Sequence, residues 1–313
     1  MLLLMFYKAR CIIFLNNMKK TVLIIGATGM LGNAQMTELS KYKNLAVFGT
    51  VRYFGEAEKY LPKKLLKNIV ANIDVENTDN LARVLSDISP DVVINCVGLI
   101  KQAKDEKDIA LNISLNSLFP HRLAHLCELQ GSRLIHISTD CVFSGKKGFY
   151  SEDDTLDAED VYGMTKALGE VGPPHLTIRT SILGHGLEGH GSLIDWFLSQ
   201  KGKIKGFSKV IYSGFPTIEI ARIIAEYIIP NEKLKGLYQV SSEPISKYEL
   251  LKMVTTVYHK KIEINEYPQA VSDRSLNSAK FRKITGYKPP SWEQLIKKMY
   301  QYYKTNRNFI QYK

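Results

Sequence analysis

Cysteine is scarce in this sequence, and its few occurrences form no recognisable site. The four cysteines among the 313 residues make no Cys-x-x-Cys pair, and no histidine stands at a metal-ligand spacing from them. A disulfide-stabilised secreted domain is therefore not expected, and neither is a metal site. The pattern fits a reducing cytoplasm, which is the location we expect.

Long apolar segments are also missing. Residues 1–17 are apolar, but Lys8 and Arg10 interrupt them and leave runs too short to span a bilayer. No basic region precedes these runs, and no small-residue cleavage site follows them, as a signal peptide would require. We expect residues 1–17 to be an extension outside the fold, ahead of a natural start at Met18. We expect no stable membrane insertion, with a weak membrane tether as the alternative.

Dense basic clusters are absent as well, although the net charge is +11. Lysine and arginine occur as scattered pairs, without the interleaved aromatic residues or known module that nucleic-acid binding requires. We therefore expect no nucleic-acid partner. Most of this charge is interpreted as solvated surface, with attraction of anionic small molecules as the alternative.

What the sequence does contain is an alternation of two kinds of segment. Hydrophobic residues make up 45% of the chain, which is enough for a large core. Continuous aliphatic runs predict strands covered on both faces, and segments of helical period lie between them. The alternation predicts an α/β fold with a doubly wound parallel sheet. The predicted strands span residues 21–25, 45–50, 70–74, 91–98, 134–137 and 236–240, and the predicted helices include 79–88, 109–130, 219–229, 246–257 and a final helix at 292–299. We expect Trp196 and Phe197 to pack in the core, with contact to a base or sugar as the alternative.

A glycine-rich turn follows the first predicted strand and precedes a helix that reaches about Leu39. Its pattern is Gly-x-x-Gly-x-x-Gly, beginning at Gly26. Such glycines allow a tight turn, close approach of a pyrophosphate and close packing of helix on strand. The turn predicts a dinucleotide site, with cofactor-binding residues Gly26, Thr28, Gly29, Met30 and Leu31.

The ends of the next strands suggest which dinucleotide binds. Arg52 follows the second strand, where an acidic residue would bind a free ribose 2′-hydroxyl. A guanidinium suits a 2′-phosphate instead, so we infer NADPH, with NADH as the alternative. Asp74 is expected to reach the adenine. Small residues at the end of the fourth strand leave room for a cofactor ribose, and they are Cys96, Val97 and Gly98.

A Tyr-x-x-x-Lys pair, Tyr162 and Lys166, follows the strand that ends at Ser138-Thr139-Asp140. Residues four apart on a helix share a face, so Lys166 is expected beside Tyr162. A nearby cation lowers the pKa of a phenol, which makes it a usable proton donor and acceptor nearer neutral pH. Thr139 can add a hydroxyl group to the same site.

Several segments of the chain match one family pattern. They are GATGMLG (26–32), DVVINCVG (91–98), HISTDCVFSG (136–145), YGMTK (162–166) with Gly169-Glu170, IRTSILG (178–184), SGFPTIEIARII (213–224) and DRSLNSAKFRKITGY (273–287). Together they resemble the extended short-chain dehydrogenase/reductases, most closely the dTDP-4-dehydrorhamnose reductase branch. The resemblance covers nearly all of residues 19–299. It implies a Rossmann domain over residues 18–180 and a smaller, interleaved substrate lobe over residues 181–313, with residues 213–242 returning to the Rossmann sheet.

The resemblance also implies roles for individual residues. Tyr162 would protonate the substrate carbonyl oxygen, Lys166 would lower the pKa of Tyr162 and bind the nicotinamide ribose, and Thr139 would hydrogen-bond at the carbonyl. The substrate-binding residues would include Thr139 and Asp140. From its own chemistry, Arg274 is a further candidate for binding a nucleotide pyrophosphate, with a surface arginine as the alternative. The implied activity is NADPH-dependent reduction of a nucleotide-linked 4-keto-6-deoxysugar for bacterial surface polysaccharide synthesis. A homodimer is a further expectation from the family.

Three other activities of similar proteins bear on this interpretation. Epimerases use nearly the same catalytic residues and remain the alternative. The 4,6-dehydratases carry Asp-Glu after the threonine, whereas this chain has Asp140 followed by Cys141, which disfavours dehydration. Some relatives are regulatory subunits that bind NADP without known chemistry, and the intact Thr139, Tyr162 and Lys166 favour an enzyme over that role.

Overall fold

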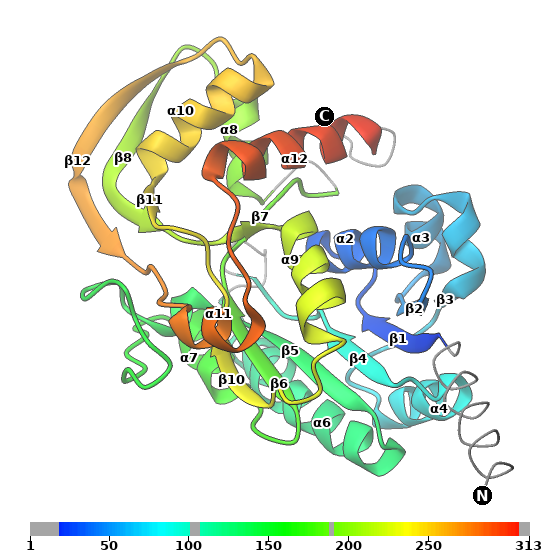
Figure 1. Ribbon diagram of the computed structural model, residues 1–313. Helices are drawn as coiled ribbons and strands as arrows, with labels where there is room; N and C mark the ends of the chain where they lie inside the picture. Colours follow the sequence, from blue (N-terminus) through cyan, green and yellow to red (C-terminus); the bar gives the residue numbers. More distant parts are fainter. Residues whose placement is uncertain (1–18, 101–106, 188–190, 307–313) are drawn as a thin grey trace, which may run out of the picture.

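The computed structural model describes residues 19–100, 107–187 and 191–306 (Figure 1). The predicted extension at residues 1–17 lies outside the described residues. Two lobes are visible in Figure 1, a larger one built on a central sheet and a smaller one formed by later parts of the chain.

The larger lobe contains a seven-stranded sheet. Its strands are β1 (Lys20–Ile25), β2 (Leu45–Thr50), β3 (Ile69–Val70), β4 (Val92–Asn95), β5 (Arg133–Thr139), β6 (Leu176–Thr180) and β10 (Gly236–Gln239). All neighbouring strands are parallel, in the order β10-β6-β5-β4-β1-β2-β3. The strand order reverses between β1 and β4, where open α/β sheets bind their ligands. The predicted doubly wound sheet is confirmed.

Helices cover both faces of this sheet. They are α2 (Met30–Leu39), α3 (Phe54–Tyr60), α4 (Thr78–Ile88), α5 (Ile109–Asn112), α6 (Phe119–Gln130), α7 (Val161–Leu168) and α9 (Thr217–Ile223), together with η1 (Lys63–Asn68), η2 (Ile113–Leu118), η3 (Asp140–Val142) and η4 (Ile224–Ile228). Val22 and Ile24 of β1 belong to one core cluster with residues of α2 and α9, whereas Leu23 and Ile25 belong to another with residues of α4 and α6. Because both faces are buried, the strand sequence is continuously aliphatic.

Two predicted strands are too long. The strand predicted at residues 70–74 ends at Val70, because Asn72 has a φ of 61°, in the left-handed region that breaks an extended strand. Asp74 therefore lies in an exposed loop. The strand predicted at residues 91–98 ends at Asn95, whose side-chain oxygen accepts a hydrogen bond from the Val97 amide at 3.0 Å and turns the chain.

The predicted helix at residues 109–130 is present, with a π-helical segment in its middle. This segment, η2, contains Asn116, which is fully buried. Its side-chain oxygen accepts from the Leu99 amide at 2.9 Å, and its side-chain amide donates to the Leu99 carbonyl at 3.1 Å. Pi-helical segments often mark functional sites. Here the segment holds the chain that leaves β4.

The smaller lobe is organised around a three-stranded mixed sheet. Its strands are β8 (Lys203–Tyr212), β11 (Ile245–Ser246) and β12 (Glu263–Asp273), and its helices are α8 (Leu193–Ser199), α10 (Lys247–Tyr258) and α12 (Trp292–Thr305). Helix α11 (Ala279–Thr285) instead lies beside the edge strand β10 of the large sheet (Figure 1). β12 runs parallel to β8, and β11 antiparallel to it. A two-stranded sheet of β7 (Ile182–Leu183) and β9 (Phe215–Pro216) completes the strands of the described residues. In Figure 1, α10 lies along the curved pair of β8 and β12.

Two aromatic residues expected in the core of this lobe differ in burial. Phe197 is fully buried, as expected, whereas Trp196 is 45% exposed. On α8, these neighbours point to different faces of a short helix, so only one of them faces the core. The prediction that Trp196 is a core residue is wrong.

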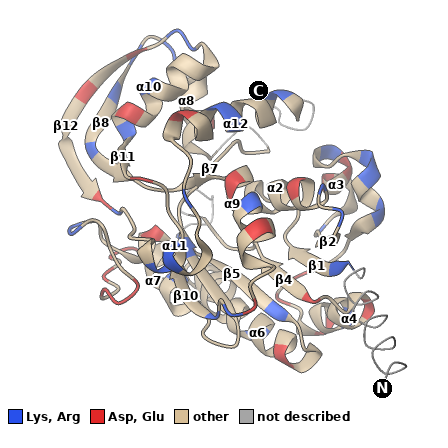
Figure 2. Cartoon of the chain, in the orientation of Figure 1, with Lys and Arg blue, Asp and Glu red and all other residues tan. Residues whose placement is uncertain are grey.

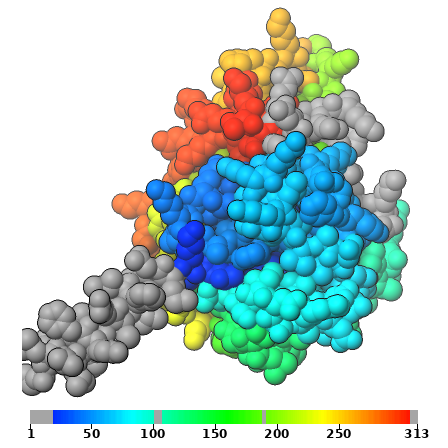
Figure 3. All heavy atoms as spheres, turned by 90° about the vertical axis from the view of Figure 1, so that its right-hand side faces the viewer, coloured from blue at the N-terminus to red at the C-terminus, as the bar shows by residue number. Residues whose placement is uncertain are grey.

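The last helix connects the two lobes. Figure 3 shows the red atoms of the C-terminal region against the blue atoms of the first helices. The Tyr302 hydroxyl lies 3.4 Å from the side-chain oxygen of Asn33 in α2, and Tyr302 and Tyr303 pack against Tyr60 and Leu187. This contact fixes the C-terminal helix beside the helix that follows the glycine turn.

Charged residues are distributed over both lobes, with lysine and arginine intermixed with aspartate and glutamate (Figure 2). Among the described residues, no helix combines the length and apolar character needed to cross a membrane.

Candidate active site

The glycine turn between β1 and α2 is tightly packed. Gly26 has a φ of 87°, and a Cβ atom on it would lie 2.7 Å from Val97 Cγ2. A Cβ atom on Gly32 would lie 2.0 Å from the Gly26 carbonyl oxygen, so the helix can approach the turn only with glycine there. The turn thus meets the end of β4 at the point where the strand order reverses, as a dinucleotide site requires.

The other predicted residues of the turn differ in environment. The Leu31 side chain is buried in the core, which leaves only its backbone for a cofactor. Met30 is half-buried, with its sulfur 3.2 Å from the position of a Cβ on Gly184. The Thr28 hydroxyl donates to a carboxylate oxygen of Glu56 at 3.2 Å. Glu56 was not identified from the sequence, because it lies after the second strand and belongs to no recognisable motif.

Arg52 and Asp74 follow neighbouring strands and are both exposed. The Asn72 amide donates to the Arg52 carbonyl at 3.1 Å, which places the two loops side by side. The Asp74 carboxylate accepts from the Glu76 amide at 3.0 Å. Both side chains therefore lie at the same edge of the sheet as the glycine turn.

The residues at the end of β4 lead towards α7. A Cβ atom on Gly98 would lie 3.0 Å from the side-chain oxygen of Asn116 and 3.9 Å from Lys166 Nζ. The Cys96 side chain packs against the hydrophobic core, and burial raises the pKa of its thiol. Cys96 therefore acts as a small core residue. The structure thus brings Gly98 and Lys166 together from distant parts of the sequence.

The predicted catalytic residues come from β5 and α7. Thr139 ends β5 and caps the short helix η3, because its hydroxyl accepts from the Cys141 amide at 3.1 Å. Asp160 caps α7 by accepting from the Gly163 amide at 2.9 Å. A Cβ atom on Gly163 would lie 2.2 Å from the Cys141 carbonyl oxygen. The glycine between Tyr162 and Lys166 therefore lets α7 approach η3 closely, and this brings Tyr162 to Thr139.

Burial dominates the electrostatics of this pair. Burial raises the pKa of Tyr162, and a hydrogen bond with the Thr139 side chain opposes the rise. Burial lowers the pKa of Lys166 to about 8, and its Nζ donates to the Ile137 carbonyl at 2.8 Å. The pKa of Tyr162 is thus raised, chiefly by desolvation, and Lys166 is not among the groups that most affect it, so the lowering of this pKa by Lys166 stays a prediction.

Two further groups extend the site towards the smaller lobe. Asp140 is buried, and burial raises the pKa of its carboxyl, while Thr139 and the positive charge of Arg274 oppose the rise. Arg274 is half-buried, and its Nε donates to the Phe143 carbonyl at 2.8 Å. Asp140 and Arg274 are therefore neighbours, although the sequence placed them far apart.

The sequence matches the family described as the RmlD substrate binding domain over residues 18–305. The chain belongs to this family. It is 28% identical over 263 residues to a dTDP-4-dehydrorhamnose reductase from Aggregatibacter actinomycetemcomitans, covering 74% of this chain and 88% of that protein. It is 27% identical over 246 residues to methionine adenosyltransferase 2 subunit beta from Danio rerio, covering 74% and 72%.

Solved structures are similar as well. The dTDP-4-dehydrorhamnose reductase from Bacillus anthracis, determined in complex with NADP, matches with a TM-score of 0.74 at 23% identity, over 91% of this chain and 99% of that one. The expected likeness to the dTDP-4-dehydrorhamnose reductases, within the extended short-chain dehydrogenase/reductases, is therefore confirmed.

A buried ion pair lies next to the candidate active site of this RmlD-family chain. Arg179 on β6 makes two hydrogen bonds of 2.7 Å with the Glu170 carboxylate, and Ser138 donates to the same carboxylate at 2.7 Å. The attraction of Glu170 also raises the pKa of Lys166, against the larger effect of burial. Bidentate pairs of this kind hold both partners rigidly. The sequence showed both residues within matching segments, but not that they meet.

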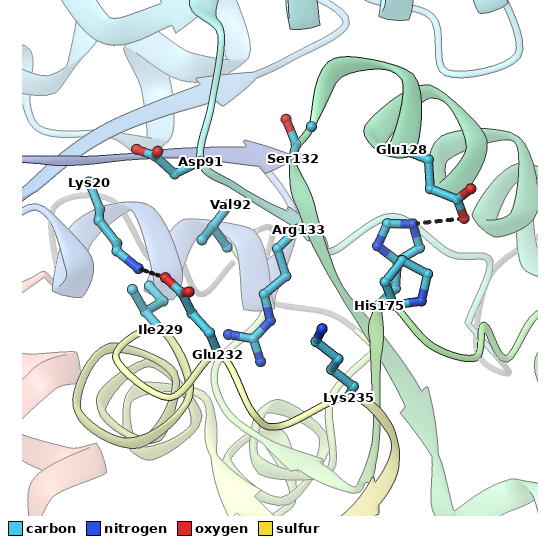
Figure 4. Close-up of a pocket in the computed structure, with 12 residues that line it drawn as sticks. Lys20, Asp91, Val92, Glu128, Ser132, Arg133, His175, Ile229, Glu232 and Lys235 are labelled. Carbon is cyan, nitrogen blue, oxygen red and sulfur yellow. Dashed lines mark hydrogen bonds and ion pairs between the residues drawn. The ribbon is translucent and has the colours of Figure 1, made fainter.

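A cavity of about 460 Å³ lies at the opposite edge of the sheet (Figure 4). Several of its charged groups are engaged in structural contacts: Lys20 pairs with Glu232 at 2.6 Å, and Arg133 donates to the Ile228 and Leu234 carbonyls at 2.9 and 2.7 Å. None of the predicted site residues lines it. Ligands of open α/β sheets bind at the carboxyl ends of strands, so this RmlD-family chain has its candidate active site at the other edge.

Proposed function

We propose that the protein is an NADPH-dependent reductase of a nucleotide-linked 4-keto-6-deoxysugar, similar to dTDP-4-dehydrorhamnose reductase, in bacterial surface polysaccharide synthesis. The observation that carries this proposal is the convergence of Thr139, Tyr162 and Lys166 beside Gly98, next to the glycine turn. A phenol and an ammonium group from α7 meet a hydroxyl group from β5 where a dinucleotide would fit.

The turn fits a dinucleotide because it has no side chain at the places where phosphate would approach. Gly26, Gly29 and the start of α2 would hold the pyrophosphate, and Gly98 and Lys166 would hold the nicotinamide ribose. When bound, the dinucleotide supplies the hydride.

The side chains of the site would donate the proton to the substrate and orient the groups that transfer it. Because burial raises the pKa of Tyr162, its phenol stays protonated at neutral pH and can donate to the developing oxyanion of the substrate carbonyl. The Thr139 hydroxyl would orient that phenol and the carbonyl oxygen. Lys166, with a pKa of about 8, would add positive charge on the side of the ribose.

The decisive experiment follows NADPH consumption with a panel of nucleotide-linked 4-keto sugars. We expect wild-type turnover with at least one of them, and a loss of about 10²–10⁴-fold in kcat for Tyr162→Phe. Tyr287→Phe is a matched control, because Tyr287 is 2% exposed and its hydroxyl donates to Glu219 at 3.0 Å, away from the site. Near wild-type turnover by Tyr162→Phe would refute the assignment.

A second candidate function is that of a subunit that binds NADP without catalysis. The similarity to a protein named as the beta subunit of methionine adenosyltransferase 2 favours it. This role predicts saturable NADPH binding, measured by quenching of protein fluorescence, with no turnover across the whole panel. Turnover of any panel member favours the reductase.

A further inference from the structure

Tyr212 is a second buried phenol near the candidate active site, and neither the motifs nor the proposed chemistry uses it. It is the last residue of β8 and is 7% exposed. Its hydroxyl is buried and makes no hydrogen bond of full geometry within the described residues, although the Ser181 side chain is close enough to act on its pKa as a weak partner. Native proteins pair nearly all buried polar atoms, so a buried hydroxyl without a full hydrogen bond calls for a specific explanation.

The groups around this hydroxyl are those of the active site. Burial raises the pKa of Tyr212, the negative charge of Asp140 adds to the rise, and Ser181 opposes it. Asp140 and Cys141 also act on the pKa of Tyr162. The two phenols therefore approach the Asp140–Cys141 turn from different elements, Tyr162 from α7 and Tyr212 from the end of β8.

The position of the Tyr212 ring is fixed by its surroundings. Its backbone pairs with Ile245 in β11, and its ring lies 5.8 Å from that of Trp292. A Cβ atom on Gly214 would lie 2.3 Å from the Tyr212 hydroxyl, so glycine at that position leaves the space that the hydroxyl occupies. A rigid ring whose hydroxyl lacks a full hydrogen bond is a preorganised hydrogen-bonding group.

We propose that Tyr212 is a specificity-determining residue whose hydroxyl binds a hydroxyl group of the sugar ring, beside the carbonyl that Tyr162 protonates. This inference rests on the proposed function, because it assumes that the substrate is a sugar. A neutral phenol suits a neutral sugar hydroxyl, whereas the guanidinium of the neighbouring Arg274 suits a phosphate. Tyr212 would be the contribution of the smaller lobe to recognition of the sugar.

The test is Tyr212→Phe in the full-length chain, which removes only the oxygen and keeps the ring contact with Trp292. We expect KM for the 4-keto nucleotide sugar to rise about tenfold, as loss of one hydrogen bond predicts. KM for NADPH should stay unchanged. Tyr287→Phe, the matched control, should lower Tm without changing either KM. Unchanged sugar KM in Tyr212→Phe, or equal changes in both variants, would overturn the proposal.

Substrate analogues sharpen the result. Nucleotide sugars that lack one ring hydroxyl at a time are titrated calorimetrically against wild type and Tyr212→Phe, with NADP present. For the contacted hydroxyl, wild type should bind the deoxy analogue about tenfold more weakly than the parent sugar, and the variant should bind both equally. Equal discrimination by both proteins at every position would contradict the inference.

This titration also separates the inference from the proposed function. Wild-type binding of nucleotide sugars without turnover would reject the reductase, while the comparison of analogues would still judge Tyr212. Wild-type turnover with no effect of Tyr212→Phe would reject the inference alone. A wild-type protein that neither binds nor reduces any nucleotide sugar would reject both.

Discussion

Replacing Lys166 with methionine should abolish activity and at the same time stabilise the protein at neutral pH. The pKa of Lys166 falls from 10.5 to about 8 because its ammonium is buried. A shift of this size corresponds to about 3 kcal/mol of unfavourable free energy for the charged form in the folded state. Methionine removes this unfavourable free energy. It also removes the hydrogen bond to the Ile137 carbonyl, and this loss offsets about 1 kcal/mol of the stabilisation. We therefore expect Lys166→Met to raise the free energy of unfolding by about 2 kcal/mol at pH 7.

The pH dependence has a defined sign. Below pH 8 the lysine is protonated in both states, so the folded protein carries the full cost. Between about pH 8 and 10.5, the unfolded chain binds a proton that the folded chain has released, so the wild-type free energy of unfolding rises with pH. The advantage of the methionine variant should therefore shrink steadily over that window.

Urea denaturation of both proteins between pH 7 and about 10 measures this difference. Lys280→Met is the matched control, because Lys280 is exposed and its Nζ also donates to a backbone carbonyl, that of Leu237 at 3.0 Å. The difference in free energy of unfolding between Lys280→Met and wild type should not change with pH. A constant difference between wild type and Lys166→Met over the same range would refute the burial argument, and a less stable variant at pH 7 would refute its magnitude.

Two further predictions concern the cofactor and the buried ion pair. Arg52→Ser should raise KM for NADPH about tenfold or more and leave KM for NADH unchanged, because only NADPH carries the 2′-phosphate; equal effects on both cofactors in steady-state kinetics would contradict the role of Arg52. Glu170→Gln should lower the free energy of unfolding by about 3–5 kcal/mol in urea titrations, because a buried guanidinium then loses its partner. Glu293→Gln, at an exposed ion pair, should change stability little, and similar losses in both glutamine variants would show that burial does not matter.

Local patterns explain which elements could be predicted. Strand β2 spans the predicted residues 45–50, and α4 differs from its prediction by one residue, because Asn77 caps its start and Ser89 ends it in the left-handed region. The glycine turn was predictable because its three glycines, a strand and a helix are contiguous in the chain. The third strand was overextended because nothing in an aliphatic run signals that Asn72 will adopt a positive φ.

The sequence alone determined the sheet, the glycine turn and the helical spacing of Tyr162 and Lys166, because each depends on neighbours within a few turns or strands. The tertiary structure alone decided what surrounds those groups. It buried Lys166 and so set its pKa near 8, it paired Glu170 with Arg179, and it placed Tyr212 beside Asp140. Burial and long-range contact are properties of the packed lobes, and no local pattern in the chain records them.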